Sequence, residues 1–123
     1  IENFREIRFE YNLFALYQLF DVFVHVPEYK EYEAFGQVYV EALAAGIPSV
    51  FTVSGIAAEF IENNENALVC NYKNSDDIYN AVVKLLTDDG LRNRLVENGL
   101  KVVQTKFNMD RYFSHLKKLY GYD

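Results

Sequence analysis

Short β-branched and aromatic runs alternate with longer segments of helical periodicity along most of this chain. Three runs are typical of strands, namely Val22–Val26, Ser49–Val53 and Ala67–Cys70. Between the first two lies Phe35–Ala45, which is apolar nearly all round and therefore predicts a buried helix. Gly46 is well placed to end that helix as its C-terminal cap.

Helical periodicity also marks most of the remaining chain, and Arg5–Phe9 alternates weakly enough to predict a short strand. The further expected helices are Asn12–Phe20 with Asn12 as its cap, Ile56–Glu62, Asp76–Leu86 capped by Ser75, Leu91–Lys106, and Asn108–Tyr120. Strands alternating with helices predict parallel strands joined by right-handed crossovers. The expected fold class is therefore α/β, a partial doubly wound, Rossmann-like parallel sheet with a helical C-terminal tail.

The composition fits one globular domain and little more, because the chain has 123 residues of which 50% are hydrophobic and 24% charged. The net charge is -6, and it is unevenly distributed: residues 1–72 carry three cations and eleven acids. The cations of the last third are interspersed with acids, so they predict a solvated helix surface and no nucleic-acid partner.

A single cysteine, Cys70, excludes an internal disulfide and favours a reducing compartment, so we expect a cytoplasmic protein. Cys70 itself is expected to be an ordinary buried thiol. No apolar run reaches the roughly 20 residues that a membrane helix needs, and no signal peptide is visible. The chain does not begin with Met, and we expect it to be part of a longer protein.

Three polar residues spaced four apart interrupt the apolar stretch after the first strand: Glu33, Gln37 and Glu41. If the helix begins near Ala34, this spacing places them along one face. A buried ionised glutamate needs a partner, and the chain has no Lys or Arg from Glu31 to Tyr72. Glu41 is therefore expected either to reach a backbone amide or water, or to accept hydrogen bonds from ligand hydroxyls.

The first strand, the polar loop after it and the helix starting at Phe35-Gly36 form a strand–loop–helix unit. Such a helix start presents unpaired N–H groups and the positive end of the helix dipole, which suits phosphate. Gly36 permits the close approach of a ligand. Because ligands of open α/β sheets bind beyond the carboxyl ends of the strands, we expect a site where Glu33 meets the Ser54-Gly55 turn.

The segment Glu33–Ala42 (Glu-Ala-Phe-Gly-Gln-Val-Tyr-Val-Glu-Ala) resembles the E-x-F-G-x-x-x-x-E-A signature of family 4 (group 1) retaining glycosyltransferases. Ala44–Val50 resembles the A-x-G-x-P-x-V that follows it, and Gly55–Glu59 resembles a G-G-x-P-E turn, although Ile56 and Ala58 replace its second Gly and its Pro. The resemblance runs over nearly the whole chain. It implies that residues 1–123 are a single partial domain, the nucleotide-sugar-binding C-terminal half of a GT-B enzyme.

The resemblance also implies a role for each matched residue. Glu33 would be the catalytic-site acid that contacts hydroxyls of the donor sugar, and Glu41 would hold the ribose hydroxyls of the nucleotide. The other donor-binding positions would act through backbone amides or close approach: Phe35, Gly36, Gln37, Val38 and Gly55. The nucleotide-diphosphate sugar would be a substrate, with no separate cofactor and no metal at the transfer step, and no His/Cys/Asp cluster has metal-ligand spacing.

His25 interrupts an apolar strand directly before this edge. Two interpretations stay open for it: a core histidine whose polar atoms are satisfied internally, or a residue that touches the donor or the acceptor.

Parts of the resembled enzymes lie outside this chain, namely a basic pair and the N-terminal domain that binds a glycan or lipid-linked acceptor. Because a leaving diphosphate needs cations, metal or amides, we expect the isolated chain to be inactive. The edge of the Val22–Val26 strand is expected to pair with a second copy or with Arg5–Phe9. Polysaccharide biosynthesis, with peripheral membrane contact only in the full-length protein, is the family context.

Two other functions remain open on the sequence. The chain is also compatible with a sugar-nucleotide binder of epimerase-like type that transfers nothing. A plain α/β interaction module of the response-regulator kind predicts an acidic Mg²⁺ pocket at the strand ends, where only Asp21 begins a strand.

Overall fold

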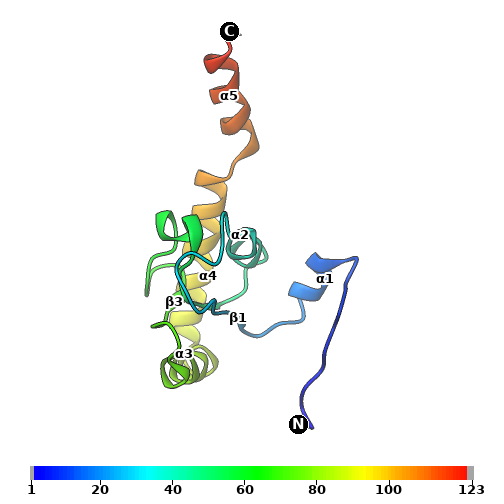
Figure 1. Ribbon diagram of the computed structural model, residues 1–123, viewed down its shortest axis with the longest axis vertical. Coiled ribbons are helices and arrows are strands. Elements are labelled where there is room, and N and C mark those ends of the chain that lie inside the picture. Colours follow the sequence, from blue (N-terminus) through cyan, green and yellow to red (C-terminus); the bar gives the residue numbers. More distant parts are fainter. Residues whose placement is uncertain (1, 122–123) are drawn as a thin grey trace.

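Three short parallel strands form the centre of the computed structural model, which describes residues 2–121 (Figure 1). The strands are β1 (Phe23–His25), β2 (Ser49–Phe51) and β3 (Leu68–Val69), in the spatial order β1-β2-β3. Val50 of β2 is paired with Val24 on one side and with Leu68 on the other. All three strands lie inside the predicted ranges, and the parallel sheet that the sequence predicts is confirmed.

Helices cover both faces of this sheet. Neighbouring residues of β2 point to opposite faces, so their contacts show which helices lie on each side. Phe51 packs with Tyr39 and Leu43 of α2 (Gln37–Ala44) in one core cluster. Val50 packs with Leu85 and Leu95 in the other cluster. Those two leucines belong to α3 (Ser75–Thr87) and α4 (Asp89–Lys106), respectively. This arrangement confirms the doubly wound α/β class.

The two ends of the chain extend away from this body (Figure 1). The N-terminal segment leads into α1 (Leu13–Tyr17), whose first turn is capped by the Asn12 side chain as predicted. At the other end, α5 (Met109–Leu119) projects beyond α4 and has no buried residue, and its predicted cap Asn108 is confirmed. No helix among residues 2–121 is both long enough and apolar enough to cross a membrane.

Several local predictions were wrong. Arg5–Phe9 is exposed and forms no strand, so it does not cover the edge of β1, which among residues 2–121 pairs only with β2. The cap of α3 is Asn74, not Ser75, because the Asn74 side chain accepts a bond from the Asp77 amide. Pairing of β1 with a second copy stays a prediction.

The predicted helix over residues 56–62 is a single 3₁₀ helix, η1 (Gly55–Glu59). Cys70 is only half-buried, although burial raises the pKa of its thiol and the nearby Asp77 charge adds to the effect.

Candidate functional site at the carboxyl edge of the sheet

The carboxyl ends of the strands meet at one edge of the sheet, as parallel pairing requires. β1 ends at His25 and is followed by a loop over residues 27–33. β2 continues through Thr52 to the Ser54-Gly55 turn, where η1 begins. This edge therefore brings Glu33 next to the Ser54-Gly55 turn, where the sequence predicts a site.

Hydrogen bonds from the end of β2 hold the loop over residues 27–33 in place. The Thr52 hydroxyl donates to the Pro27 carbonyl at 2.6 Å. The Ser54 hydroxyl donates to the Lys30 carbonyl at 2.8 Å and accepts from the Glu33 amide at 3.0 Å. The Gly55 amide adds a bond of 2.9 Å to the Lys30 carbonyl. The backbone that carries Glu33 is thus fixed by residues that follow it by about twenty positions.

Tyr39 of α2 supports the same turn through hydrogen bonds to its backbone. Its side chain is fully buried, donates to the Thr52 carbonyl at 2.6 Å and accepts from the Ser54 amide at 3.1 Å. Its ring lies 4.7 Å from the ring of Phe51 and 5.0 Å from that of His25. Burial raises the pKa of the Tyr39 phenol to about 12, and the Glu33 charge adds to this shift despite the opposing bond from Ser54.

Two glycines with positive φ allow this close packing. Gly36 has φ +74°, and a Cβ there would lie 2.7 Å from the Tyr39 ring. Gly55 has φ +60°, and its Cβ would lie 2.5 Å from the Glu33 carbonyl oxygen. Because a side chain at Gly55 would collide with backbone, this glycine brings the turn against the Glu33 loop.

Glu33 lies outside α2, which corrects the prediction that Glu33, Gln37 and Glu41 share one helical face. The left-handed Gly36 is the N-cap, so the helix begins only at Gln37. One Glu33 carboxylate oxygen instead lies 3.2 Å from His25 Nε2, and both side chains are partly exposed.

His25 has an incompletely satisfied side chain. Its Nε2 atom is within ion-pair distance of Glu33, yet it has no hydrogen-bond partner of good geometry among residues 2–121. The internally satisfied core histidine that the sequence allows is therefore not what the structure contains. Glu33, whose side chain is partly exposed, is able to offer polar atoms to a ligand at this edge, whereas His25 Nε2 is buried beside it.

The start of α2 presents free backbone donors next to Glu33. No side chain caps this end of the helix. Among the described residues, four consecutive amides donate no hydrogen bond: those of Phe35, Gly36, Gln37 and Val38. Unpaired amides at a helix start carry the positive end of the helix dipole, so they suit an anionic group.

Glu41 lies one turn further along α2 and faces α1. Its carboxylate accepts a hydrogen bond from the Tyr17 hydroxyl at 3.1 Å, so its partner is neither a backbone amide nor a cation. Burial, the bond to Glu41 and the Glu41 charge together raise the pKa of Tyr17 to about 12. The half-buried carboxylate keeps its second oxygen for other partners.

Sequence reasoning missed Tyr39 and Lys73 as contributors to this edge, and it placed the Ser54-Gly55 turn there without a role for the Ser54 hydroxyl. Lys73 follows β3 and lies 3.8 Å from the centre of the Tyr29 ring, with Glu28 also 3.8 Å from its ammonium group. A cation is therefore present beside the loop although none lies near Glu33 on its C-terminal side in the sequence. No local pattern marks Lys73, because it is 44 positions from Tyr29 along the chain.

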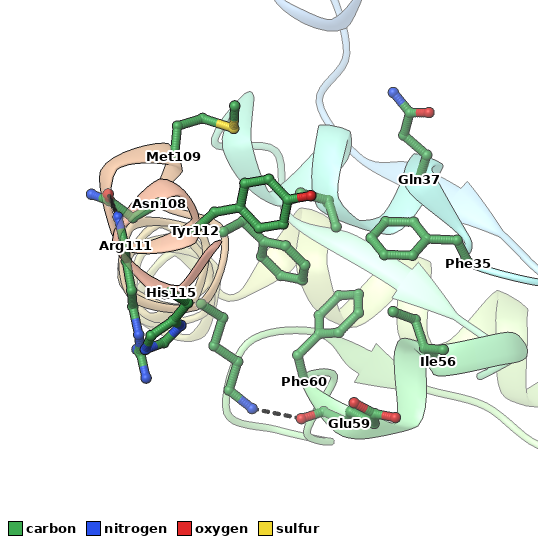
Figure 2. Close-up of a pocket in the computed structure, with 13 residues that line it drawn as sticks. Phe35, Gln37, Ile56, Glu59, Phe60, Asn108, Met109, Arg111, Tyr112 and His115 are labelled. Carbon is green, nitrogen blue, oxygen red and sulfur yellow. Dashed lines mark hydrogen bonds between the residues drawn. The ribbon is translucent and has the colours of Figure 1, made fainter. Parts of the chain in front are cut away.

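A cavity of about 740 Å³ adjoins the start of α2 and lies between that helix end, η1 and the joint of α4 with α5 (Figure 2). The Phe35 ring points into this cavity, whereas the side-chain carboxamide of Gln37 points away from it. Neither Glu33 nor Glu41 lines this cavity. The predicted site therefore shares Phe35 and Gln37 with this cavity, while its two glutamates lie outside the lining.

Comparison with known proteins identifies the family. Residues 3–102 match the family model of glycosyl transferases group 1. An uncharacterized glycosyltransferase of Methanocaldococcus jannaschii, MJ1607, is 36% identical over 85% of this chain and 26% of its own length. The capsular polysaccharide biosynthesis glycosyltransferase CapM of Staphylococcus aureus is 29% identical over 87% of this chain and 27% of its own length.

Solved structures show the same fold. The C-terminal domain of LpcC, a group 1 glycosyl transferase of Francisella tularensis, has a TM-score of 0.70 and 27% identity over 85% of this chain and 52% of that domain. HepE of Anabaena, crystallised with UDP-glucose, has a TM-score of 0.76 and 22% identity over 86% of this chain and 29% of its own.

The fold is therefore that of the C-terminal domain of a GT-B protein. The chain belongs to the group 1 glycosyl transferases. It spans about a quarter of the length of the curated relatives it matches.

Proposed function

We propose that this chain is the nucleotide-sugar-binding part of a retaining glycosyltransferase of family 4 that transfers a hexose. The observation that carries the proposal is the juxtaposition of Glu33 with the uncapped start of α2 at the carboxyl edge of the sheet. Membership of the group 1 family and the bound UDP-glucose of HepE support it.

In this proposal, backbone amides bind the diphosphate and carboxylates bind the hydroxyl groups of the donor. The free amides of residues 35–38 and the dipole of α2 stabilise the diphosphate, whose negative charge grows as the sugar leaves. Glu33 accepts hydrogen bonds from the sugar hydroxyls, and His25 lies beside it. The oxygen of Glu41 that Tyr17 leaves free accepts from the ribose hydroxyls.

The isolated chain is proposed to bind the donor without transferring its sugar. Lys73, a cation at this edge, is held beside Tyr29 and Glu28. The remaining charge stabilisation and the site for a glycan or lipid-linked acceptor are assigned to an N-terminal domain. The similarity to CapM favours a role in polysaccharide biosynthesis.

Ligand-observed NMR with UDP, GDP, UDP-glucose and GDP-mannose tests this proposal. We expect the chain to bind one nucleotide and its sugar conjugate, and Glu41→Ala to weaken both because the ribose contact is lost. Glu97→Ala removes an exposed carboxylate on α4 and serves as the matched control. Equal binding by Glu41→Ala and the unmodified chain would remove the ribose role, and sugar transfer by the 123-residue chain would contradict its assignment as a binding part.

A further inference from the structure

The Ser54 hydroxyl occupies a special place at this edge because it bonds to two points of one loop. It donates to the Lys30 carbonyl and accepts from the Glu33 amide, at 2.8 and 3.0 Å. These bonds join residues 21 and 24 positions apart, and Ser54 itself is fully buried. The backbone amide of Glu33 is thus hydrogen-bonded directly to Ser54.

Tyr39 fixes Ser54 in turn. Its phenol accepts from the Ser54 amide at 3.1 Å and donates to the Thr52 carbonyl at 2.6 Å. The same ring packs edge-on against His25, whose Nε2 lies 3.2 Å from the Glu33 carboxylate. The backbone of Glu33 is therefore held by the Ser54 hydroxyl, which Tyr39 supports, and the imidazole beside the Glu33 carboxylate packs on the Tyr39 ring.

We propose that Ser54, supported by Tyr39, is a positioning residue that orients Glu33 for the donor sugar; this inference rests on the proposed function. Ser54 touches no ligand in this role, since its hydroxyl is buried and engaged on both sides. Ser54 should affect only the binding of the sugar part of the donor. The nucleotide part is assigned to Glu41 and the amides at the start of α2, and these groups make no hydrogen bond to the Ser54 hydroxyl. A residue that orients Glu33 must change the affinity for a nucleotide sugar more than that for the nucleotide alone.

The chain supplies a matched control at the start of β2, the strand that leads to Ser54. Ser49 is also fully buried and donates to a backbone carbonyl at 2.8 Å, that of Ile47. Its bond is local and lies at the opposite end of β2 from the Glu33 loop. Ser49→Ala and Ser54→Ala therefore delete the same group from equally buried sites, and only the second disturbs Glu33.

The experiment measures the Kd of UDP and of UDP-glucose for the unmodified chain, Ser54→Ala, Ser49→Ala and Glu33→Gln. GDP and GDP-mannose replace them if the chain prefers guanosine. We expect Ser54→Ala to weaken UDP-glucose binding about tenfold, the effect of one charge-assisted hydrogen bond, and to leave UDP within about twofold. Ser49→Ala should leave both constants unchanged, and Glu33→Gln should match or exceed the effect of Ser54→Ala.

A second variant guards against misfolding of the first. Tyr39→Phe keeps the ring but removes the hydroxyl that holds the Ser54 amide, so it should reproduce the selective loss of UDP-glucose affinity, but to a smaller extent.

A readout that needs no ligand is the NMR signal of the His25 imidazole ring. His25 is one of two histidines in the chain, so its signal is assigned in a His115→Gln background. Ser54→Ala and Glu33→Gln should both displace this signal, and Ser49→Ala should not.

The outcomes separate this inference from the proposed function. If Glu33→Gln loses UDP-glucose selectively while Ser54→Ala behaves like Ser49→Ala, the positioning role is wrong and the proposed function stands. If the unmodified chain binds no nucleotide sugar, the proposed function fails and the inference fails with it. If Ser54→Ala weakens UDP and UDP-glucose equally, the role is structural and the inference is overturned.

Discussion

The carboxyl edge of the sheet and helix α5 are held together in opposite ways. At the edge, Ser54 and Tyr39 are fully buried and bond to backbone groups up to 24 positions away. In α5, the Ser114 hydroxyl bonds to the Asp110 carbonyl four positions away, the Arg111 side chain reaches no further than the Thr105 carbonyl six positions away, and no residue is buried. Damage should therefore spread through the edge and remain local in α5.

Removal of a whole side chain should show this contrast most strongly. Tyr39→Ala empties a fully buried site beside Phe51, so the free energy of unfolding should fall by about 3–5 kcal/mol. Phe113→Ala, at a side chain that is 52% exposed in α5, should cost within about 0.5 kcal/mol. Denaturant unfolding of both variants measures the difference, and comparable losses would refute the contrast.

The two regions also offer a pair of glycines with positive φ. Gly55→Ala should cost about 1–2 kcal/mol for its left-handed backbone and a further 1–3 kcal/mol, roughly, for displacing the Glu33 carbonyl. Gly121, which follows α5, has φ +71°, but no atom of the neighbouring described residues lies within 4 Å of the new Cβ, so Gly121→Ala should show only the backbone cost. Thermal unfolding compares them, and equal costs would mean that the Glu33 loop yields freely.

Alkaline pH should lower the free energy of unfolding, because the phenols of Tyr17 and Tyr39 are buried. The pKa of Tyr17 and that of Tyr39 are raised from 10.0 to about 12, so between these values the unfolded chain releases protons that the folded chain retains. Stability is therefore unchanged below pH 10 and falls from pH 10 to 12, by on the order of 2 kcal/mol for each tyrosine. Denaturant unfolding across this range should show a shallower decline in Tyr17→Phe than in the exposed control Tyr112→Phe.

Loss of a helix cap should produce the smallest effect. Asn108 accepts from the Arg111 amide at 3.1 Å, so Asn108→Ala should cost about 1 kcal/mol and fray only the start of α5. Amide hydrogen exchange should rise in α5 while protection of β2 and α2 is retained. Loss of protection in β2 would show that α5 is coupled to the sheet.

The same contrast explains which predictions the sequence supports. The cap and helix at Asn108 were predicted correctly because their signals are local. The start of α2 was misplaced because Gly36 adopts its left-handed conformation while packed on Tyr39, a contact that composition does not reveal. Glu33 and the Ser54-Gly55 turn were both predicted at this edge, but the bond from the Glu33 amide to the Ser54 hydroxyl joins residues 21 positions apart and has no local sequence signal.

The acid-rich first part of the chain has a kinetic consequence for any anionic ligand. Residues 1–72 carry a net charge of -8 and include every proposed donor contact. An incoming diphosphate is therefore repelled at long range and attracted only near the α2 amides. Added salt should accordingly speed its association by shortening the Debye length, whereas it slows binding to a basic phosphate site.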